Sequence, residues 1–299
     1  MAEENVNPEE EHTPVEENTE QPEVAKDEFG GEIVIEGKSK VVSRVVSMDS
    51  LPEALRIDLP ADQLQGIALL NFKDDITAGN GETKDTQIGK GAINNAISAY
   101  LFNALSTIPN HYIRADGNYM VIVAGKVLPI EVIFRYKAVG SFAKRYGIDG
   151  GPSVMRMVDG IIEPLIEFCL KSDELDDPVI GEGAMIQLGL VGRDTLDTVR
   201  RMAIQTANTL KSIFALNNID LIDGKLEFIE NMGGTILLAD ELSPDSFRLV
   251  DFNTGESLDK DIFRKDGSEV TDKYQVVLDR LKAGSEIHTS GAGACKAGQ

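Results

Sequence analysis

The hydrophobic positions of this chain follow two periods, which predict strands in some segments and helices in others. Hydrophobic residues that alternate with polar ones, or that form short runs between turn residues, are typical of strands. This pattern predicts strands at residues 32–35, 41–42, 65–72, 119–123 and 127–134. A glycine turn at residues 37–40 joins the first two strands, and a turn at residues 124–126 joins the last two.

A period of 3.6 residues predicts two helices. The first begins near Gly91, keeps its hydrophobic positions on one face up to Leu105, and ends before Pro109. The second is long and has Asp194 as its expected N-cap. Its expected core stripe consists of Leu196, Val199, Ala203, Leu210, Ile213 and Phe214. Because strands come first and a mixed half follows, we expect an α+β fold with two lobes.

Residues 219–245 carry the most informative pattern. Asp223, Lys225 and Glu227 alternate with hydrophobic residues or glycine, as in a strand with one buried and one open face. A turn at residues 231–234 leads into a second strand, which ends at Asp240 and Glu241. A four-residue loop in this hairpin would place Lys225 opposite Asp240, with Glu227 as the diagonal neighbour. We therefore expect carboxylates and an ammonium group to gather on one face.

This hairpin has two interpretations. Two carboxylates from adjacent strands suit Mg²⁺, which fills its remaining positions with water and substrate phosphate, and a neighbouring lysine can bind a phosphate oxygen. The alternative is a solvated strand face with a cross-strand salt bridge, which is the more common arrangement in proteins generally. The pattern alone leaves both open.

Composition and charge exclude several classes of protein. The chain has 299 residues, 42% of them hydrophobic, which is enough to bury a core. Its formal net charge of −21 opposes general nucleic-acid binding. We find no signal peptide and no long apolar run, so we expect no membrane partner and a cytoplasmic protein. Two cysteines and three histidines cannot form a disulfide framework or a four-cysteine zinc site.

The two ends of the chain differ from its middle. Residues 1–29 contain eleven carboxylates against one lysine and almost no large hydrophobic residues, so we expect a disordered acidic tail that catalysis does not need. Residues 284–299 are small and glycine-rich, and we expect a second, flexible tail there. Between the tails we expect a β-rich lobe at residues 30–128 and an α/β lobe at residues 129–283. A homo-oligomer is compatible with this organisation.

Two basic segments offer candidate phosphate sites. The turn at residues 37–40 matches neither a P-loop nor a dinucleotide-binding motif, yet a glycine turn between strands can cover a nucleotide, and the alternative is an ordinary basic hairpin turn. Residues 134–145 concentrate Arg135, Lys137, Lys144 and Arg145 around Ser141 in a very acidic chain. The alternative there is an amphipathic helix with a basic outer face. No motif of nucleophilic catalysis is found, and we expect Cys169 to be a buried, inert thiol.

Taken in order, these segments resemble the SAICAR synthetase family of purine biosynthesis over residues 31–281. The resemblance rests on blocks at residues 36–40, 75–81, 89–95, 129–135, 140–148, 171–178, 225–228, 238–249 and 258–264. It implies a two-lobed, ATP-grasp-like fold with an antiparallel N-terminal lobe. It also implies an ATP-dependent ligase that joins L-aspartate to carboxyaminoimidazole ribonucleotide (CAIR) through an acyl phosphate, releasing ADP and phosphate.

The resemblance also implies roles for individual residues. The nucleotide would be bound by Gly37, Lys38, Ser39, Lys40, Lys225 and Glu227, and Mg²⁺ would be held by Glu227 and Asp240, so that Lys225, Glu227 and Asp240 form the catalytic set. The substrate would contact Asn80, Arg135, Ser141, Arg248, Asp261 and Arg264. The chain departs from the family pattern at Tyr136, where many members have Asn, at Gly224, where Phe is usual, and at Ile122–Val123, where paired lysines are often found.

Two further hypotheses remain open. The chain could be another carboxylate–amine ligase of similar fold that takes a different amine or a related imidazole nucleotide. It could also be a regulator that binds nucleotide without catalysis, although such a protein would be expected to lack the two metal carboxylates. Substrate profiling separates the first of these from the SAICAR synthetase hypothesis.

Overall fold

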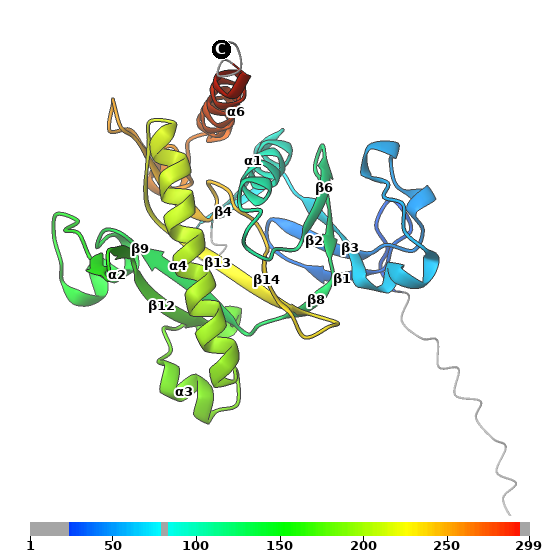
Figure 1. Cartoon of the computed structure of the whole chain (residues 1–299), viewed down its shortest axis with the longest axis horizontal. Coiled ribbons are helices and arrows are strands. Elements are labelled where there is room, and N and C mark those ends of the chain that lie inside the picture. Colours follow the sequence, from blue (N-terminus) through cyan, green and yellow to red (C-terminus); the bar gives the residue numbers. More distant parts are fainter. Residues whose placement is uncertain (1–23, 79–82, 294–299) are drawn as a thin grey trace, which may run out of the picture.

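The computed structural model describes residues 24–78 and 83–293, and it shows two β-sheets with helices packed between and around them. The N-terminal sheet lies to the right in Figure 1 and the C-terminal sheet to the left, with the long helix α4 (Arg193–Leu216) lying across the latter. Within the described residues no helix is long and apolar enough to cross a membrane. The arrangement confirms the predicted α+β class.

The N-terminal sheet is antiparallel throughout. Its strands, in spatial order, are β1 (Ile33–Glu36), β2 (Lys40–Arg44), β3 (Ile67–Phe72), β7 (Tyr119–Val123) and β6 (Tyr112–Asp116). Short 3₁₀ turns at Met48–Ser50, Glu53–Leu55 and Ala61–Gly66 connect β2 to β3. Helix α1 (Lys90–Ala104) packs on the sheet after a separate hairpin formed by β4 (Asp75–Ala78) and β5 (Thr83–Thr86).

The C-terminal sheet is built around one long strand, β13 (Ile219–Asn231). It pairs antiparallel with β9 (Ile130–Arg135), β15 (Phe247–Asp251), β14 (Ile236–Ala239) and β8 (Gly125–Val127), and β12 (Leu165–Leu170) extends the sheet beyond β9. The remaining elements are α2 (Gly140–Tyr146), β10 (Arg156–Val158), β11 (Ile161–Glu163), the turn Asp173–Leu175, α3 (Glu182–Gln187), α5 (Asp261–Asp266) and α6 (Thr271–Gly293).

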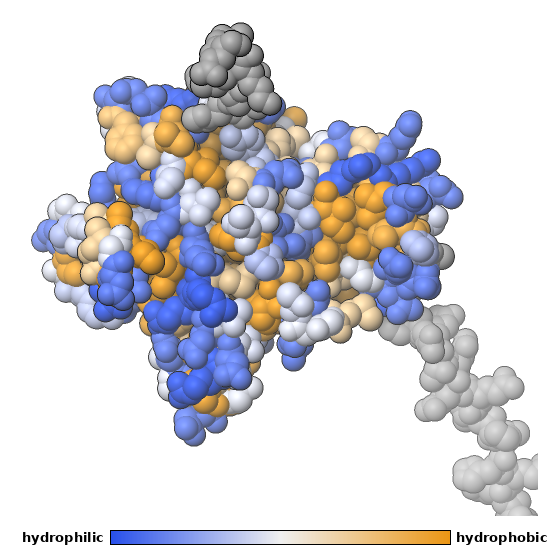
Figure 2. All heavy atoms as spheres, viewed as in Figure 1, coloured by the Kyte–Doolittle hydropathy of each residue, from blue (hydrophilic) through white to orange (hydrophobic). Residues whose placement is uncertain are grey.

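One hydrophobic core serves both lobes. Buried residues of α1 and β3, such as Leu101 and Leu70, belong to the same cluster as Phe228 of β13 and Leu210 of α4. Helix α6, from the C-terminal part of the chain, packs against α1 of the N-terminal part. Figure 2 shows hydrophobic side chains at the surface over the N-terminal sheet, whereas α4 presents mainly hydrophilic ones. The N-terminal and C-terminal sheets therefore share this core.

Several predicted boundaries are corrected by the structure. Residues 124–126 do not form a free turn, because β8 pairs there with β13, and the strand expected at residues 127–134 is divided before β9. The N-cap of α4 is Gly192, and Asp194 lies in the first turn. Five members of the predicted α4 stripe are buried, whereas Ile213 is half-buried.

The structure also corrects the inner limits of both expected tails. Asp27 accepts hydrogen bonds from the backbone N–H of Phe29 and Gly31 and from the hydroxyl of Ser43, and the Phe29 ring packs edge-on against Tyr119. Helix α6 continues to Gly293, beyond the expected start of the flexible C-terminal segment. The rest of each expected tail, residues 1–23 and 294–299, lies outside the described residues.

The register of the β13–β14 hairpin differs by one residue from the predicted register. Glu227 lies opposite Ala239 and Glu230 opposite Ile236, because the loop contains three residues, not four. Asn231 donates its backbone N–H to Thr235, and Gly234 adopts a left-handed conformation with φ of 76°. A turn closed by a left-handed glycine is a common three-residue hairpin loop. Strand pairing consequently ends at Ala239, and Asp240 leaves the sheet.

Candidate active site

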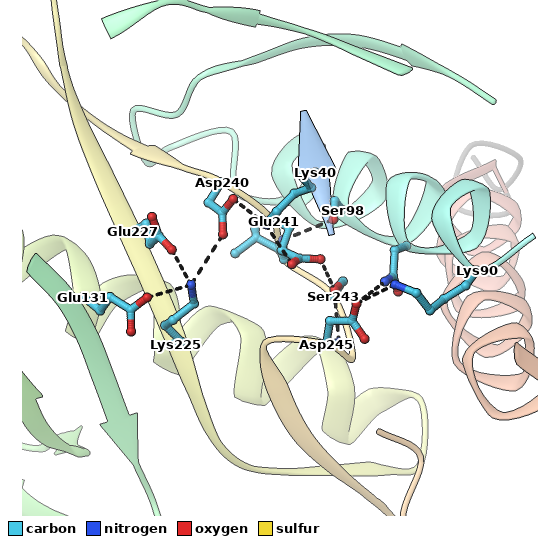
Figure 3. Close-up of polar contacts among 12 residues, drawn as sticks. Lys40, Lys90, Ser98, Glu131, Lys225, Glu227, Asp240, Glu241, Ser243 and Asp245 are labelled. Atoms are coloured by element: carbon cyan, nitrogen blue, oxygen red, sulfur yellow. Dashed lines mark hydrogen bonds and ion pairs between the residues drawn. The ribbon is translucent and has the colours of Figure 1, made fainter. Parts of the chain in front are cut away.

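Lys225 lies at the centre of the candidate active site. Its ammonium group is 3.1 Å from Oε1 of Glu131 and 3.7 Å from Oδ2 of Asp240, and it donates a hydrogen bond to Glu227. Figure 3 shows these three carboxylates pointing toward the lysine from β9, from the end of β14 and from β13 itself. The predicted convergence of Lys225, Glu227 and Asp240 is confirmed, although the register that brings it about is different.

Two further lysines complete this charged cluster. Lys40, at the start of β2, binds Asp240 and lies 2.8 Å from Oε1 of Glu241. Lys171, at the end of β12, binds the second oxygen of Glu227. Asp240 has a φ of 65°, a left-handed conformation that non-glycine residues seldom adopt, and its side chain meets both Lys40 and Lys225. The backbone is thus held in an uncommon conformation at the point where the charges converge.

The electrostatics of this cluster keep its main carboxylates ionised. Burial alone would raise the pKa of Glu227, but the ammonium groups of Lys225, Lys171 and Lys40 together outweigh burial and hold the pKa below its ordinary value. The pKa of Asp240 is likewise lowered, because Lys40 and Lys225 outweigh its burial. The pKa of Glu131 is raised instead, since burial and Glu227 outweigh its contact with Lys225. Lys40 and Lys225 have raised pKa values despite burial, because carboxylates surround them.

A deep apolar cleft opens beside the cluster, between the N-terminal sheet and β13. It measures about 750 Å³, and its walls include Ile35, Leu70 and Phe228, while Glu227 and Asp240 also line it. This volume lies in the range typical of small-molecule sites. The cleft is thus apolar along most of its walls and charged where Glu227 and Asp240 line it.

His111 also lines this cleft, and sequence reasoning missed it. The side chain is buried, and burial lowers its pKa to about 4, so the imidazole is neutral at physiological pH. Its Nε2 has no hydrogen-bond partner within the described residues. A lone histidine before a strand gives no signal from which this position could have been predicted.

A second, polar hollow of about 680 Å³ lies at the outer side of the glycine turn. Gly37 and Lys38 line it together with residues of the β4–β5 hairpin and with Asp173. The Lys38 ammonium lies 2.8 Å from Oδ1 of Asp173, so this ion pair joins the two lobes across the hollow. The two lysines of the turn therefore point to different partners, Lys40 to the charged cluster and Lys38 to the opposite lobe.

Arg135 and Arg248 form the walls of a third, smaller pocket of about 230 Å³. Both guanidinium groups donate to Oδ2 of Asp223, at 2.6 Å from Arg135 and 2.8 Å from Arg248. Arg135 also donates to Glu167 at 2.8 Å, and Arg248 to Asp261 at 2.7 Å. Asp223 is buried, and its pKa is raised because burial outweighs the two arginines. The arginines are thus fixed in place by carboxylates behind them.

The same pocket collects most of the other predicted substrate residues. Ser141 and Arg264 line it, and Arg264 donates to Oδ1 of Asp261 at 2.6 Å, so Asp261 lies directly behind the pocket wall. Lys225 lines it as well and thereby connects it to the charged cluster. Asn80 lies outside the described residues.

A sequence model described as SAICAR synthetase matches residues 61–281, which is most of the chain. The chain belongs to the SAICAR synthetase family. It is 40% identical over 216 residues to the phosphoribosylaminoimidazole-succinocarboxamide synthase of Methanocaldococcus jannaschii, an alignment that covers 71% of this chain and 86% of that protein.

Solved structures of SAICAR synthetases have the same fold. The synthase from Ehrlichia chaffeensis superposes with a TM-score of 0.71 and 31% identity, covering 84% of this chain and 99% of the other. A SAICAR synthetase solved in complex with ADP gives a TM-score of 0.70 and 32% identity, covering 83% of this chain and 97% of the other. The two-lobed fold that the resemblance implied is therefore confirmed.

Two of the departures from the SAICAR synthetase pattern, Tyr136 and Gly224, have structural explanations. The hydroxyl of Tyr136 donates to Oδ1 of Asn208 on α4 at 2.9 Å, so this buried side chain serves packing behind the sheet. At Gly224 the rings of Phe134 and Phe247 occupy the space of a side chain, and an added Cβ would lie 2.6 Å from Cζ of Phe134. Neither departure changes a residue of the charged cluster.

Sequence reasoning gave no role to Glu131, Lys171 or Glu241, which all take part in the cluster. Glu131 and Lys171 belong to sequence blocks that carry the resemblance to SAICAR synthetases. The blocks were recognised, but the contacts of these two residues with the charged cluster were not predicted. Lys171 contacts Glu227, which is 56 residues away in the chain, and Glu131 contacts Lys225, which is 94 residues away. Contacts over such separations cannot be read from local spacing.

Proposed function

We propose that the charged cluster around Lys225 and the pocket of Arg135 and Arg248 together carry out the reaction of this family, the ATP-dependent joining of L-aspartate to CAIR. The observation that carries this proposal is that Lys225 belongs to both sites. A phosphoryl group and a ribonucleotide bound in the two sites would therefore meet at one ammonium group. The activity itself follows from family membership, since the chain is an ATP-dependent carbon–nitrogen ligase of purine biosynthesis.

The apolar cleft suits the base of ATP. Its hydrophobic walls can enclose an adenine ring, while Lys40 and Lys225 at the charged cluster suit the phosphates. The glycine turn at residues 37–40 would then cover the phosphates from the N-terminal lobe. The relative solved with ADP supports the use of an adenine nucleotide by this fold.

The donor set of Glu227 and Asp240 fits Mg²⁺. Both carboxylates are ionised and converge on the same lysine, so each presents an oxygen toward one place. Mg²⁺ commonly takes one or two protein carboxylates and completes its octahedron with water and substrate phosphate. When bound, Mg²⁺ would neutralise charge on the phosphates of ATP.

The pocket of Arg135 and Arg248 suits the ribose phosphate of CAIR. Two guanidinium groups that converge on one place, together with the hydroxyl of Ser141, offer the charged and neutral donors that a phosphate dianion requires. Asp223, Glu167 and Asp261 hold the arginines from behind. Arg264 would add a third cation at the edge of the pocket.

This arrangement matches the chemistry of the reaction. A carboxylate oxygen of CAIR attacks the γ-phosphorus of ATP, ADP departs, and the product is an acyl phosphate. The amine of L-aspartate then attacks the carbonyl carbon, phosphate departs with that oxygen, and the amine loses a proton. Positioning and charge neutralisation carry these steps, so lysines, arginines and carboxylates suffice without a protein nucleophile.

The experiment that tests the proposed function measures ADP release by the purified chain with CAIR, L-aspartate, ATP and Mg²⁺. We expect release to require all four components, and SAICAR to appear in equal amount to ADP. A panel of other amino acids in place of aspartate separates this function from that of a ligase with another amine. Absence of ADP release with every combination would instead favour the regulator.

Compartment and assembly belong to the same proposal. We place the enzyme in the cytoplasm, where a reducing environment agrees with the free thiol of Cys169. Burial and nearby carboxylates raise the pKa of this thiol to about 11, so it is unreactive as the sequence suggested, although the side chain is half-buried and not buried as expected. Light scattering would establish whether the chain forms a homo-oligomer.

A further inference from the structure

Lys90 is a fully buried lysine to which the proposed reaction gives no role. It begins helix α1, and its side chain is 1% exposed. Its ammonium group lies 2.8 Å from Oδ2 of Asp245, in the loop that connects β14 to β15. Lys90 and Asp245 are 155 residues apart in the chain, so this ion pair ties the N-terminal lobe to the loop.

Asp245 receives hydrogen bonds from two helices at once. Asn94, one turn after Lys90 on α1, donates to Oδ2 at 3.0 Å, and the hydroxyl of Tyr274 on α6 donates to Oδ1 at 2.6 Å. Figure 3 shows the Lys90 side chain reaching from α1 to Asp245 beside Ser243. Both oxygens of the carboxylate are therefore engaged, and the loop is fixed from two sides.

This loop carries groups of both proposed sites. It begins at Asp240, and after Asp245 the carbonyl of Ser246 accepts a hydrogen bond from the backbone N–H of Lys225 at 2.9 Å. Arg248 follows two residues later on β15, and Asp245 and Ser246 line its pocket. A displacement of Asp245 would therefore reach Lys225 and Arg248 through the backbone.

The helix end that bears Lys90 is itself rigidly placed. The carboxylate of Asp74 accepts hydrogen bonds from the backbone N–H of Gly89 at 3.1 Å and of Gly91 at 2.9 Å. Gly91 also packs so closely against the backbone of Phe72 that an added Cβ would overlap its carbonyl oxygen. Lys90 thus projects from a fixed point on the N-terminal sheet.

A buried ion pair is a poor means of gaining stability, because desolvation of the two charges offsets much of their attraction, and hydrophobic replacements often serve as well. What such a pair can supply is a defined geometry. We propose that Lys90 is a positioning residue, which acts through Asp245 to hold Arg248 and Lys225 where CAIR binds. This inference rests on the proposed assignment of the arginine pocket to the ribose phosphate.

The test compares two variants of the full chain, Lys90→Met and Tyr274→Phe, by steady-state kinetics and by calorimetric binding of CAIR without ATP. We expect the CAIR Kd and KM to rise about tenfold in Lys90→Met and about threefold in Tyr274→Phe. Without its contacts to Asp245 the loop between β14 and β15 can move, and this would displace the Arg248 guanidinium from the CAIR phosphate. The KM for ATP should rise clearly less than the KM for CAIR, since the apolar cleft and Lys40 are unchanged and only Lys225 links the loop to the ATP phosphates. Tyr274→Phe removes only the hydroxyl that binds Asp245 and keeps the aromatic ring in the core. The inference can therefore be tested on this variant if Lys90→Met does not fold.

Asn95→Ala is the matched control. Asn95 lies on the same helix, is equally buried and donates to the backbone of Gly117 and Tyr119 at 2.8 and 2.9 Å, away from the loop. This variant should lower the melting temperature and leave CAIR binding unchanged. If the Lys90 and Tyr274 variants behave like the control, or if CAIR and ATP are affected equally, the inference is wrong. Wild-type chain that neither binds CAIR nor releases ADP would instead overturn the proposed function.

Discussion

At the scale of single residues, Arg135 and Arg248 show how a pocket can present positive charge in a very acidic chain. Their bonds to Asp223, Glu167 and Asp261 use Nε and Nη1 of each guanidinium. A guanidinium has five N–H donors in a rigid fork, so further donors remain for a phosphate. The carboxylates therefore orient the guanidinium groups, and helix α2 contributes Ser141 beside them.

The first prediction concerns Arg248→Lys. Lysine cannot bridge Asp223 and Asp261 while also meeting a phosphate, so the KM for CAIR should rise by roughly one to two decades, equivalent to about 1.5 to 3 kcal/mol. The KM for ATP should change little. Arg280→Lys is the control, because Arg280 also binds an aspartate, Asp251, but on α6 and outside the pocket. Equal changes in both Michaelis constants would contradict the phosphate assignment.

The second prediction concerns the proposed metal carboxylate Asp240. Asp240→Asn removes a negative charge from between Lys40 and Lys225, so turnover at saturating Mg²⁺ should fall by about two decades or more while the chain still folds. Asp220→Asn on β13 serves as the control, since Asp220 also binds two lysines, Lys137 and Lys211, away from the cleft. Near-normal turnover of Asp240→Asn would show that the metal is held elsewhere.

At the scale of elements, local patterns predict where strands and helices lie, and contacts between elements decide the rest. Alternation at residues 223–227 correctly predicted a strand, which is part of β13, but the face expected to be open is largely closed, since Asp223 and Glu227 are buried. The register of its hairpin was missed because it depends on the backbone of Gly234, which a four-residue turn pattern does not specify. The start of α4 was placed on Asp194 from residue type, but the chain enters the helix at Gly192.

The candidate site was predictable to the extent that its residues lie in recognisable blocks. The convergence of Lys225, Glu227 and Asp240 follows from one hairpin, which is a local structure. Lys171 and Glu131 join the cluster from strands β12 and β9, and only the sheet order brings them there. Such non-local pairings depend on the packing of the whole chain.

The third prediction concerns the junction between β15 and α5, where Asp259 accepts hydrogen bonds from the backbone N–H of Leu249 and Asp261. Burial raises the pKa of Asp259 to about 6 in the folded chain, above its value in the unfolded chain. Stability from this group is therefore fully present below about pH 4 and is lost as the pH rises through 6.

The variant Asp259→Asn tests this pH dependence. We expect the wild-type chain to lose its advantage in unfolding free energy over the variant as the pH rises from 4 to 7, by on the order of 2 kcal/mol. Urea unfolding at several pH values measures the difference. A difference that grows with pH would mean that the folded chain prefers ionised Asp259.

At the scale of the whole molecule, the boundary of the folded body is testable with two truncations. Deletion of residues 1–23 removes nothing that the structure describes, whereas deletion of residues 1–29 also removes Asp27 and Phe29, which contact Ser43 and Tyr119. The fourth prediction is that the shorter deletion leaves melting temperature and turnover nearly unchanged. The longer one should lower the melting temperature by several degrees, because the partly buried contacts of Asp27 and Phe29 are lost. Equal behaviour of the two would place the boundary elsewhere.

The core shared by the two lobes has a consequence for how ligand binding is detected. Since α1, β3, β13 and α4 contribute to one cluster, the lobes should unfold in a single cooperative transition. A ligand at one hundred times its Kd then adds about 2.7 kcal/mol to the stability of the entire chain, wherever it binds. Thermal-shift screening would register ATP and CAIR alike without telling their sites apart. Locating a ligand therefore requires shifts measured on variants of each pocket.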